Sequence, residues 1–397
     1  MKADNLTQIR SDRVWLTKQQ CDIEEFGALV ERTTEAGDYP FAAAVEKNVL
    51  IYDGDAVRDA VRSPETRKAL LAEWVEAMTT GPGVVAFKRA FADTAPIDTA
   101  TTLFNEMIAE QHATGTGGGD HFAKPGANDR IWNALEKFCL RDPAAFAQYY
   151  GNEIIALISE AWLGPAYQMT SQVNCVNPGG AAQSAHRDYH LGFQSPEVIE
   201  HYPVHVHRIS PVLTLQGAVA HCDMPLESGP TLYLPYSQAY LHGYLATGLP
   251  EFKAYFAEHH VQLPLEKGDA AFFNPALFHG AGNNRSTDIR RMANLLQVSS
   301  AYGRAMESVD RTRMSAALYP TLVAMLASGA ISKAAAANAI ASTAEGYSFP
   351  TNLDRDPPIG GLAPETQQAL FHRALDAGWN PAAFEQALDE QATKKLT

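Results

Sequence analysis

The sequence predicts an α+β protein with a β-rich middle section between helical ends. From Tyr167 to Ser300, short apolar runs alternate with Pro, Gly and Asn turns, which is the pattern of a β-sandwich or barrel. Before and after this section, apolar residues recur at helical spacing. The chain has 397 residues, enough for one large domain or two, and it contains no internal repeat.

The individual elements follow from local periodicity and from the turn residues that bound them. Helices are predicted at 17–36, 63–78, 96–111, 130–138, 143–163, 308–343, 364–379 and 381–391. Strands are predicted at 48–55, 83–91, 167–176, 204–223, 231–237, 269–275 and 292–300. Residues 113–129 are rich in Gly without an apolar period, so we expect this segment to be a mobile loop that closes over a substrate.

Composition excludes several classes of function. The formal net charge is −14, so neither nucleic acid nor an anionic membrane surface is an expected partner. The four cysteines, Cys21, Cys139, Cys175 and Cys222, have no CxxC spacing, which predicts free thiols rather than a structural zinc site or a disulfide framework. The N-terminus is polar and resembles no secretory signal. We therefore expect a cytoplasmic protein.

The segment SAHRDYHLGF (184–193) places His186, Asp188 and His190 at every second position. On a strand, alternate side chains share one face, so these groups either converge on a metal or line a solvated edge. Two imidazoles and one carboxylate form the facial ligand set of non-haem Fe(II) sites. His279, which ends an apolar run and precedes Gly280, is the best candidate for a distant imidazole. Arg290 follows 11 residues later (290 − 279).

Together, HRD (186–188), SGPTLYLPYSQ (228–238), GDAAFFNPALFHG (268–280), NNRS (283–286) and the pair Arg290–Arg291 resemble the phytanoyl-CoA dioxygenase family of Fe(II)/2-oxoglutarate oxygenases. The resemblance covers residues 165–300 and, more weakly, 80–165. It implies a double-stranded β-helix (a cupin-like jelly roll) at 81–302, with helical extensions at 1–80 and 303–397. The apolar faces of the C-terminal helices would allow self-association into a homo-oligomer.

The same resemblance implies the site. The iron ligands would be His186, Asp188 and His279, and Arg290 would bind the distal carboxylate of 2-oxoglutarate. Since neighbouring strand residues point to opposite faces, Arg291 would be solvated. The reaction would use O2 to hydroxylate a C–H bond of a small-molecule substrate, with succinate and CO2 as co-products. Because Asp188 is a carboxylate and not a small residue, the resemblance favours hydroxylation over halogenation.

Other residues leave alternatives open. Gln172, Asn174 and Gln183 flank the metal segment and are either contacts to 2-oxoglutarate or ordinary sheet-edge amides. His190 is expected near the metal or the substrate but not as a ligand. His205 and His207 form a rival metal pair without a carboxylate at a familiar spacing. A cupin-like metal-dependent isomerase or lyase, or a catalytically silent binding protein, is the alternative function.

Overall fold

The computed structural model describes residues 10–116 and 126–396. The chain divides into two compact units, each assembled from separate stretches of sequence. Unit 1 comprises residues 1–90, 118–129 and 174–293, and unit 2 comprises residues 91–117, 130–173 and 294–397. The division into 1–80, 81–302 and 303–397 that the sequence suggested stays a prediction. The centre of the Gly-rich segment, 117–125, lies outside the described residues, and so does the predicted closure of that loop.

The structure is mixed α+β, as predicted, and it contains a large sheet. Eight strands form one sheet in the order β1-β2-β3-β9-β6-β11-β5-β4, and three form a second sheet in the order β10-β7-β8. The first sheet contains β1 (Ala44–Glu46), β2 (Val49–Asp53), β3 (Val84–Lys88), β4 (Asn128–Ile131), β5 (Gln168–Val176), β6 (Thr214–Ala220), β9 (Ala270–Phe273) and β11 (Arg291–Ser299). The second contains β7 (Leu232–Leu234), β8 (Val261–Gln262) and β10 (Phe278–Gly280). Strands β4, β5 and β11 each run from one unit into the other.

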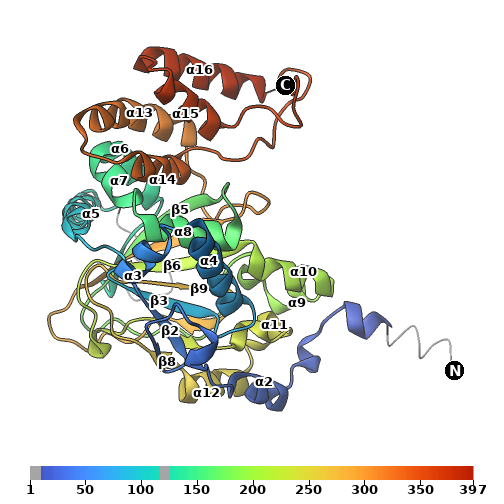
Figure 1. Cartoon of the computed structure of the whole chain (residues 1–397). Helices are drawn as coiled ribbons and strands as arrows, with labels where there is room; N and C mark the ends of the chain where they lie inside the picture. Colours follow the sequence, from blue (N-terminus) through green and yellow to red (C-terminus); the bar gives the residue numbers. More distant parts are fainter. Residues whose placement is uncertain (1–9, 117–125, 397) are drawn as a thin grey trace. The chain divides into compact units, whose positions relative to one another are not determined.

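The N-terminal part of unit 1 contains a crossover connection between two parallel strands. Strands β2 and β3 pair in parallel and are joined by helices α3 (Gly54–Ala60) and α4 (Pro64–Thr79) (Figure 1). Both strands are almost entirely buried apolar runs, as expected for strands covered on both faces. Helix α4 starts with Pro64 at its first turn, and Ser63 makes no side-chain capping bond. Proline suits this position because its missing N–H would have no partner in the helix.

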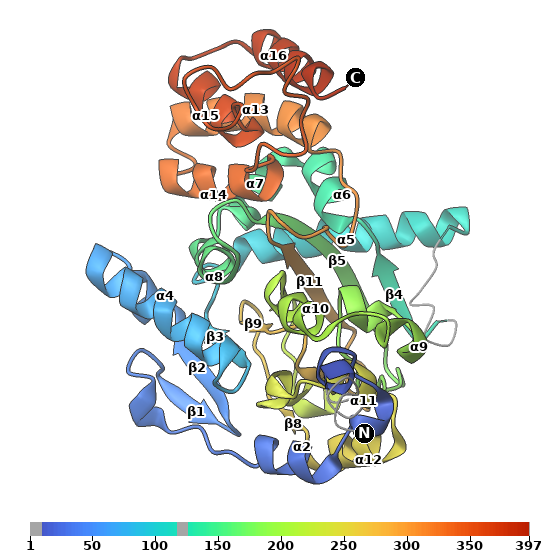
Figure 2. The ribbon, with the colours of Figure 1, turned by 90° about the vertical axis from the view of Figure 1, so that its right-hand side faces the viewer.

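The three-stranded sheet has two faces of different character. Strands β7 and β10 pair antiparallel, with Tyr233 opposite His279 and Leu234 opposite Phe278. Leu234 and Phe278 pack with residues of α2 (Ile23–Val30) and α12 (Pro250–His259), which lie side by side (Figure 2). Tyr233 belongs to a separate cluster with Phe273. Because side chains alternate along a strand, His279 shares the face of Tyr233, away from the covering helices.

The remaining described elements of unit 1 are short helices: η1 (Lys18–Gln20), η2 (Ala36–Asp38), η3 (His190–Phe193), α9 (Pro196–Ile199), α10 (Val204–Ile209), η4 (Ser210–Val212), η5 (Leu226–Ser228), η6 (Ser237–Ala239) and α11 (Gly243–Ala246). The region 204–209 was predicted to be a strand, which is wrong. Val204 and Val206 favour a strand locally, but after Pro203 the chain forms the six-residue helix α10. Tertiary packing therefore overrides local preference there.

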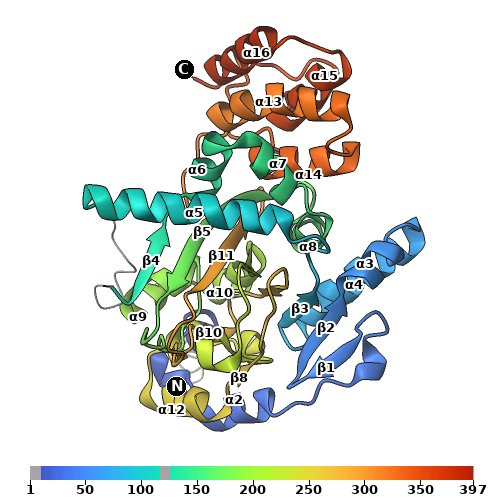
Figure 3. The same cartoon turned by 90° about the vertical axis from the view of Figure 1, so that its left-hand side faces the viewer.

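Unit 2 is mainly helical. Its helices are α5 (Ala95–Thr114), α6 (Ala134–Arg141), α7 (Pro143–Tyr150), α8 (Glu153–Leu163), α13 (Arg311–Ser328), α14 (Lys333–Thr343), α15 (Gln367–Asp376) and α16 (Pro381–Lys394). Helix α13 packs against α6, α7 and α16, and α14 packs against α7 and α8 (Figure 3). The buried Tyr319 hydroxyl donates to the carbonyls of Ala374 and Trp379. No helix among residues 10–116 and 126–396 has the length and apolar character needed to cross a membrane.

Candidate metal centre

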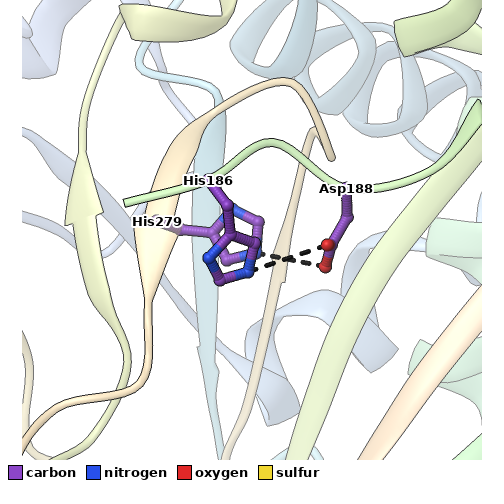
Figure 4. Close-up of side chains that lie close together, drawn as sticks. All are labelled: His186, Asp188 and His279. Carbon is purple, nitrogen blue, oxygen red and sulfur yellow. Dashed lines mark ion pairs between the residues drawn. The ribbon is translucent and has the colours of Figure 1, made fainter. Parts of the chain in front are cut away.

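Three predicted side chains converge in unit 1. His186, Asp188 and His279 each offer a ligand atom, and these atoms all lie within 4.8 Å of one another. His186 Nε2 is 3.7 Å from Asp188 Oδ1, and His279 Nε2 is 3.3 Å from Asp188 Oδ2 (Figure 4). Metal–ligand bonds of about 2.1 Å at right angles place neighbouring ligand atoms roughly 3 Å apart. The spacing therefore suits one metal ion held by all three groups.

The backbone that carries these ligands is not the regular strand that we predicted. His186 forms an isolated antiparallel bridge with His279, in which each backbone N–H donates to the other residue's carbonyl at 3.0 and 3.2 Å. Asp188 N–H donates to Pro275 O at 3.0 Å. After Asp188 the chain turns through positive φ at Tyr189 and His190, which breaks any strand. Alternation thus holds for His186 and Asp188 but does not extend to His190.

Both imidazole rings are oriented for metal binding. His186 Nδ1 lies 2.9 Å from Ser184 O, and His279 Nδ1 lies 2.8 Å from Leu277 O. A carbonyl only accepts, so each Nδ1 carries a proton, and in the neutral ring the Nε2 lone pair is then the one that can bind a metal. Hydrogen bonds of this kind fix the tautomer of metal-binding histidines. The donor set therefore fits an iron ion.

Asp188 is held as a carboxylate. Burial by itself would raise the pKa of Asp188, but the two neighbouring imidazoles and the hydrogen bond from Gln216 lower it overall. The Gln216 side-chain amide donates to Asp188 Oδ2 at 2.5 Å. The other oxygen, Oδ1, is the one nearer to His186. The site thus supplies one anionic and two neutral ligands.

Arg187 lies between two of these ligands and is 3% exposed. Its guanidinium donates to the carbonyls of Ser237 and Tyr240 at 2.6 and 2.9 Å. It also stands over the rings of Tyr244 and Phe278, at 5.0 and 5.3 Å from their centroids. Burial lowers the pKa of Arg187 to about 10, so the group is still a cation at neutral pH.

The burial of Arg290 and Arg291, which follow His279, is the reverse of the prediction. The Arg290 side chain is 49% exposed and binds Asp129 Oδ2 at 3.4 Å and Asn177 Oδ1 at 3.3 Å. Arg291, which we expected to be solvated, is 7% exposed. The reason lies in the preceding turn, where Asn284 Nδ2 donates to Ile289 O at 2.8 Å. Strand β11 then begins at Arg291, and a shift of one residue exchanges the two faces of a strand.

Arg291 has an unusual environment. Burial lowers the pKa of its guanidinium to about 10, so it remains charged at neutral pH. Its side chain forms no hydrogen bond or ion pair with any of the described residues, although a buried cation is ordinarily paired. Its charge acts on the buried Tyr233, whose strand partner is His279. Phe273 links the same two residues, at 5.1 Å from the Tyr233 ring and 4.7 Å from the His279 ring.

The three predicted amides are engaged in different contacts. Gln172, in unit 2, is fully buried and receives hydrogen bonds from Arg130 through its Oε1, while its Nε2 donates to Gln297 at 3.1 Å. Asn174 Oδ1 accepts from Asn128 at 3.3 Å. Gln183 Oε1 accepts from the backbone N–H of Ala281 at 3.2 Å.

The other histidines do not join the cluster. His190 starts η3, with Nδ1 3.5 Å from Ser210 Oγ, and burial lowers its pKa. His205 and His207 lie on helix α10, where residues two apart face different directions. His205 is exposed, whereas His207 is 2% exposed and faces Tyr202 O at 3.2 Å. The rival metal pair therefore does not form.

Two residues at the site were missed. Gln216 lies on β6, 28 residues after Asp188 (216 − 188), in a run that carries no motif. Alternation along the segment directs Arg187 away from the metal, and the structure buries it. Its position between two candidate ligands was the available signal.

Comparison with known proteins gives the family. The sequence model of phytanoyl-CoA dioxygenase (PhyH) matches residues 65–292, more than half of the chain. No curated protein is significantly similar in sequence.

Solved structures that resemble the chain include a non-heme alpha ketoglutarate dependent epimerase, SnoN, and a carbocyclase, SnoK, both from nogalamycin biosynthesis. Each is 18% identical with a TM-score of 0.40 over 60% of this chain, covering 85% of SnoN and 84% of SnoK. A third, EvdMO1, is 17% identical with a TM-score of 0.40 over 58% of this chain and 50% of its own. Structural similarity at this level does not indicate the activity. The motifs of the sequence imply dependence on iron and 2-oxoglutarate, and the His–Asp–His cluster fits an iron ion. Because the family model matches residues 65–292, the chain belongs to the phytanoyl-CoA dioxygenase family.

Proposed function

We propose that this protein is an Fe(II)- and 2-oxoglutarate-dependent dioxygenase that hydroxylates a C–H bond of a small-molecule substrate. Succinate and CO2 are the co-products. The observation that carries the proposal is the convergence of His186, Asp188 and His279 within 4.8 Å. Two neutral imidazoles and one carboxylate on one side of a metal leave positions for a chelating co-substrate and dioxygen.

The residues of the site hold the metal or orient its ligands. His186 Nε2, His279 Nε2 and one Asp188 oxygen hold the iron, and Gln216 orients the carboxylate through its 2.5 Å hydrogen bond. The iron, when bound, supplies the centre at which dioxygen and 2-oxoglutarate react. The largely buried His279 and Asp188 side chains, 5% and 15% exposed, limit access of water, whereas His186, at 34%, marks the more open side.

We propose Arg291 in place of Arg290 as the partner of the distal carboxylate of 2-oxoglutarate. A buried guanidinium without a partner is suited to receive a carboxylate in a two-pronged ion pair. Arg290 already binds Asp129 and Asn177 at the surface. Gln172, Asn174 and Gln183 stay candidates for contacts to 2-oxoglutarate, which they could make only by exchanging hydrogen bonds that they form now.

Hydroxylation is preferred to halogenation because Asp188 fills the position that a halide would need. A cupin-like isomerase or lyase is the second candidate, and it would require neither 2-oxoglutarate nor an unpaired buried arginine. A silent binding protein would not need the oriented Nε2 atoms. We further propose that the two sheets form a double-stranded β-helix, and that the protein is cytoplasmic, as its free cysteines suggest.

The test is anaerobic titration with Fe(II) and then 2-oxoglutarate, followed by addition of O2 and a panel of small-molecule substrates. Stoichiometric iron, 2-oxoglutarate binding that depends on iron, and substrate-dependent succinate release are expected. His279→Ala should abolish iron binding. Iron binding without any affinity for 2-oxoglutarate would favour the isomerase or lyase.

A further inference from the structure

The segment that carries two of the proposed ligands has little regular support. Between Gln183 and His190, His186 makes the only bridge that the structure describes, and no strand is formed. A metal site nevertheless requires its ligands to be held within a fraction of an ångström. Other contacts must therefore fix this backbone.

The side chain of Arg187 makes such contacts. Its Nη2 group donates to the carbonyls of Ser237 and Tyr240 at 2.6 and 2.9 Å, in and just after η6. The guanidinium plane is also packed against the rings of Tyr244 and Phe278. No carboxylate forms an ion pair with Arg187 in the described part of the chain. The group is therefore held by carbonyl dipoles and aromatic faces, not by an opposite charge.

The same turn is attached to the strand of the third ligand. Ser237 Oγ accepts a hydrogen bond of 2.7 Å from the backbone N–H of Phe278, the residue before His279. Ser237 Oγ in turn donates to Leu234 O at 2.6 Å. Ser237 thus holds both ligand-bearing segments, one through its carbonyl and the other through its hydroxyl.

The space around the guanidinium is shaped for it. A Cβ atom added at Gly243 would overlap the guanidinium carbon of Arg187, and one added at Gly192 would overlap the Arg187 carbonyl. Neither glycine has a positive φ. Glycine is therefore required at these two positions by the close approach of Arg187 and not by backbone conformation. Arg187 is accordingly seated in a closely fitted cage.

We propose that Arg187 is a positioning residue for the metal centre, which ties the His186–Asp188 segment to the turn that also fixes His279. This proposal rests on the proposed function, since it concerns the same metal site. Arginine suits this role better than lysine because its planar group can donate to two carbonyls and stack on two rings at once.

The experiment compares Arg187→Met with the unaltered full-length protein. Co(II) is the probe, because its visible absorption reports coordination geometry as well as occupancy. We expect Arg187→Met to weaken Co(II) binding at least tenfold and to change the absorption spectrum of the bound ion. The Tm of each metal-free protein is measured in parallel.

Arg311→Met is the matched control. Arg311 is a largely buried arginine, its side chain 10% exposed, that also donates to backbone carbonyls, those of Met169 and Thr343 at 2.9 and 3.2 Å. It has Glu345 as a carboxylate neighbour at 3.9 Å, lies in unit 2 and holds no ligand. The Arg311→Met variant should have a lower Tm, but its Co(II) affinity should stay within about twofold of that of the unaltered protein and its spectrum should be unchanged. Arg187→Met with a lowered Tm but normal affinity and spectrum would reduce Arg187 to a purely structural role and overturn the proposal.

Two further variants test the proposal even if Arg187→Met does not fold. Arg187→Lys keeps the charge without the planar fork, and Gly243→Ala displaces the guanidinium while keeping Arg187. Both should weaken Co(II) binding and alter the spectrum, and normal Co(II) binding by both would overturn the proposal even if Arg187→Met does not fold. Failure of the unaltered protein to bind Co(II) would instead remove the proposed function, and this inference with it.

Discussion

Arg290 and Arg291 are adjacent in sequence but differ in what surrounds them. Arg290 is half exposed and already paired, whereas Arg291 is buried, charged and without a hydrogen-bond or ion-pair partner in the described part of the chain. In a site that binds a dicarboxylate, the buried unpaired cation is the one that gains most from the ligand. The difference gives the first test at the scale of single residues.

Arg291→Ala should weaken 2-oxoglutarate binding to the iron-loaded protein by about 2 kcal/mol or more, which is roughly 30-fold. Arg290→Ala, the matched control, removes a surface ion pair worth about 1 kcal/mol or less and should leave the affinity nearly unchanged. Anaerobic calorimetry measures both. Equal losses in the two variants would show that Arg291 has no special role in binding the co-substrate.

Gln216 offers a second test at this scale. Gln216→Leu removes the donor to Asp188 Oδ2 at similar volume, and loss of such an outer hydrogen bond costs about 10- to 100-fold in metal affinity. Fe(II) or Co(II) titration measures the change. Gln262→Leu is a suitable control, because Gln262 donates to Pro230 O and contacts no ligand. Unaltered metal affinity in Gln216→Leu would mean that Asp188 is oriented by the histidines alone.

At the scale of elements, the ligand-bearing segment 184–190 is joined to β10 by the His186–His279 bridge. A metal bound to both would add a cross-link between them. Segments with few backbone hydrogen bonds open readily, and their amides exchange quickly. The exchange rate of this segment should therefore depend on metal.

Hydrogen exchange in peptides covering 184–190 should slow markedly when Co(II) is added to the metal-free protein, most at the amides of His186 and Asp188. These two amides donate to His279 O and Pro275 O, bonds that a metal cross-link would hold closed. Peptides from the buried strand β3 serve as the internal control and should not change. Equal protection with and without metal would show that the segment is already fixed before binding.

At the scale of the whole molecule, the C-terminal helices are part of the interior of unit 2. Helix α13 buries Met314, Leu318 and Leu322, and it packs against α6 and α7. Removing it would expose the faces of those helices, and apolar patches of this kind cause aggregation. The predicted self-association through these helices stays a prediction, which sedimentation of the full-length protein can test.

Truncation after residue 302 should give insoluble protein, because it removes α13 to α16 together. A chain ending at Lys394, the last residue of α16, should remain soluble and is the control. Solubility on expression and metal binding of any soluble fraction are the measurements. A soluble truncated protein with normal metal affinity would show that these helices are dispensable for the site.

Several features could be predicted from the sequence because they depend on local pattern. The buried strands β2 and β3 and the helices of unit 2 show apolar runs or helical spacing. The candidate ligands His186, Asp188 and His279 carry a motif whose spacing reflects the needs of a metal. Chemistry restricted to a few residue types leaves a legible pattern, even when the ligands come from distant segments.

Other features were decided only by tertiary structure. The turn at 284–289 sets where β11 begins, and so places Arg291 and not Arg290 inside. Residues 204–209 form a helix against their β-branched composition. Gln216 and the cage around Arg187 depend on side chains that meet across segments. Strand phase and packing partners are determined by contacts between residues far apart in sequence, and one sequence on its own records no such contacts.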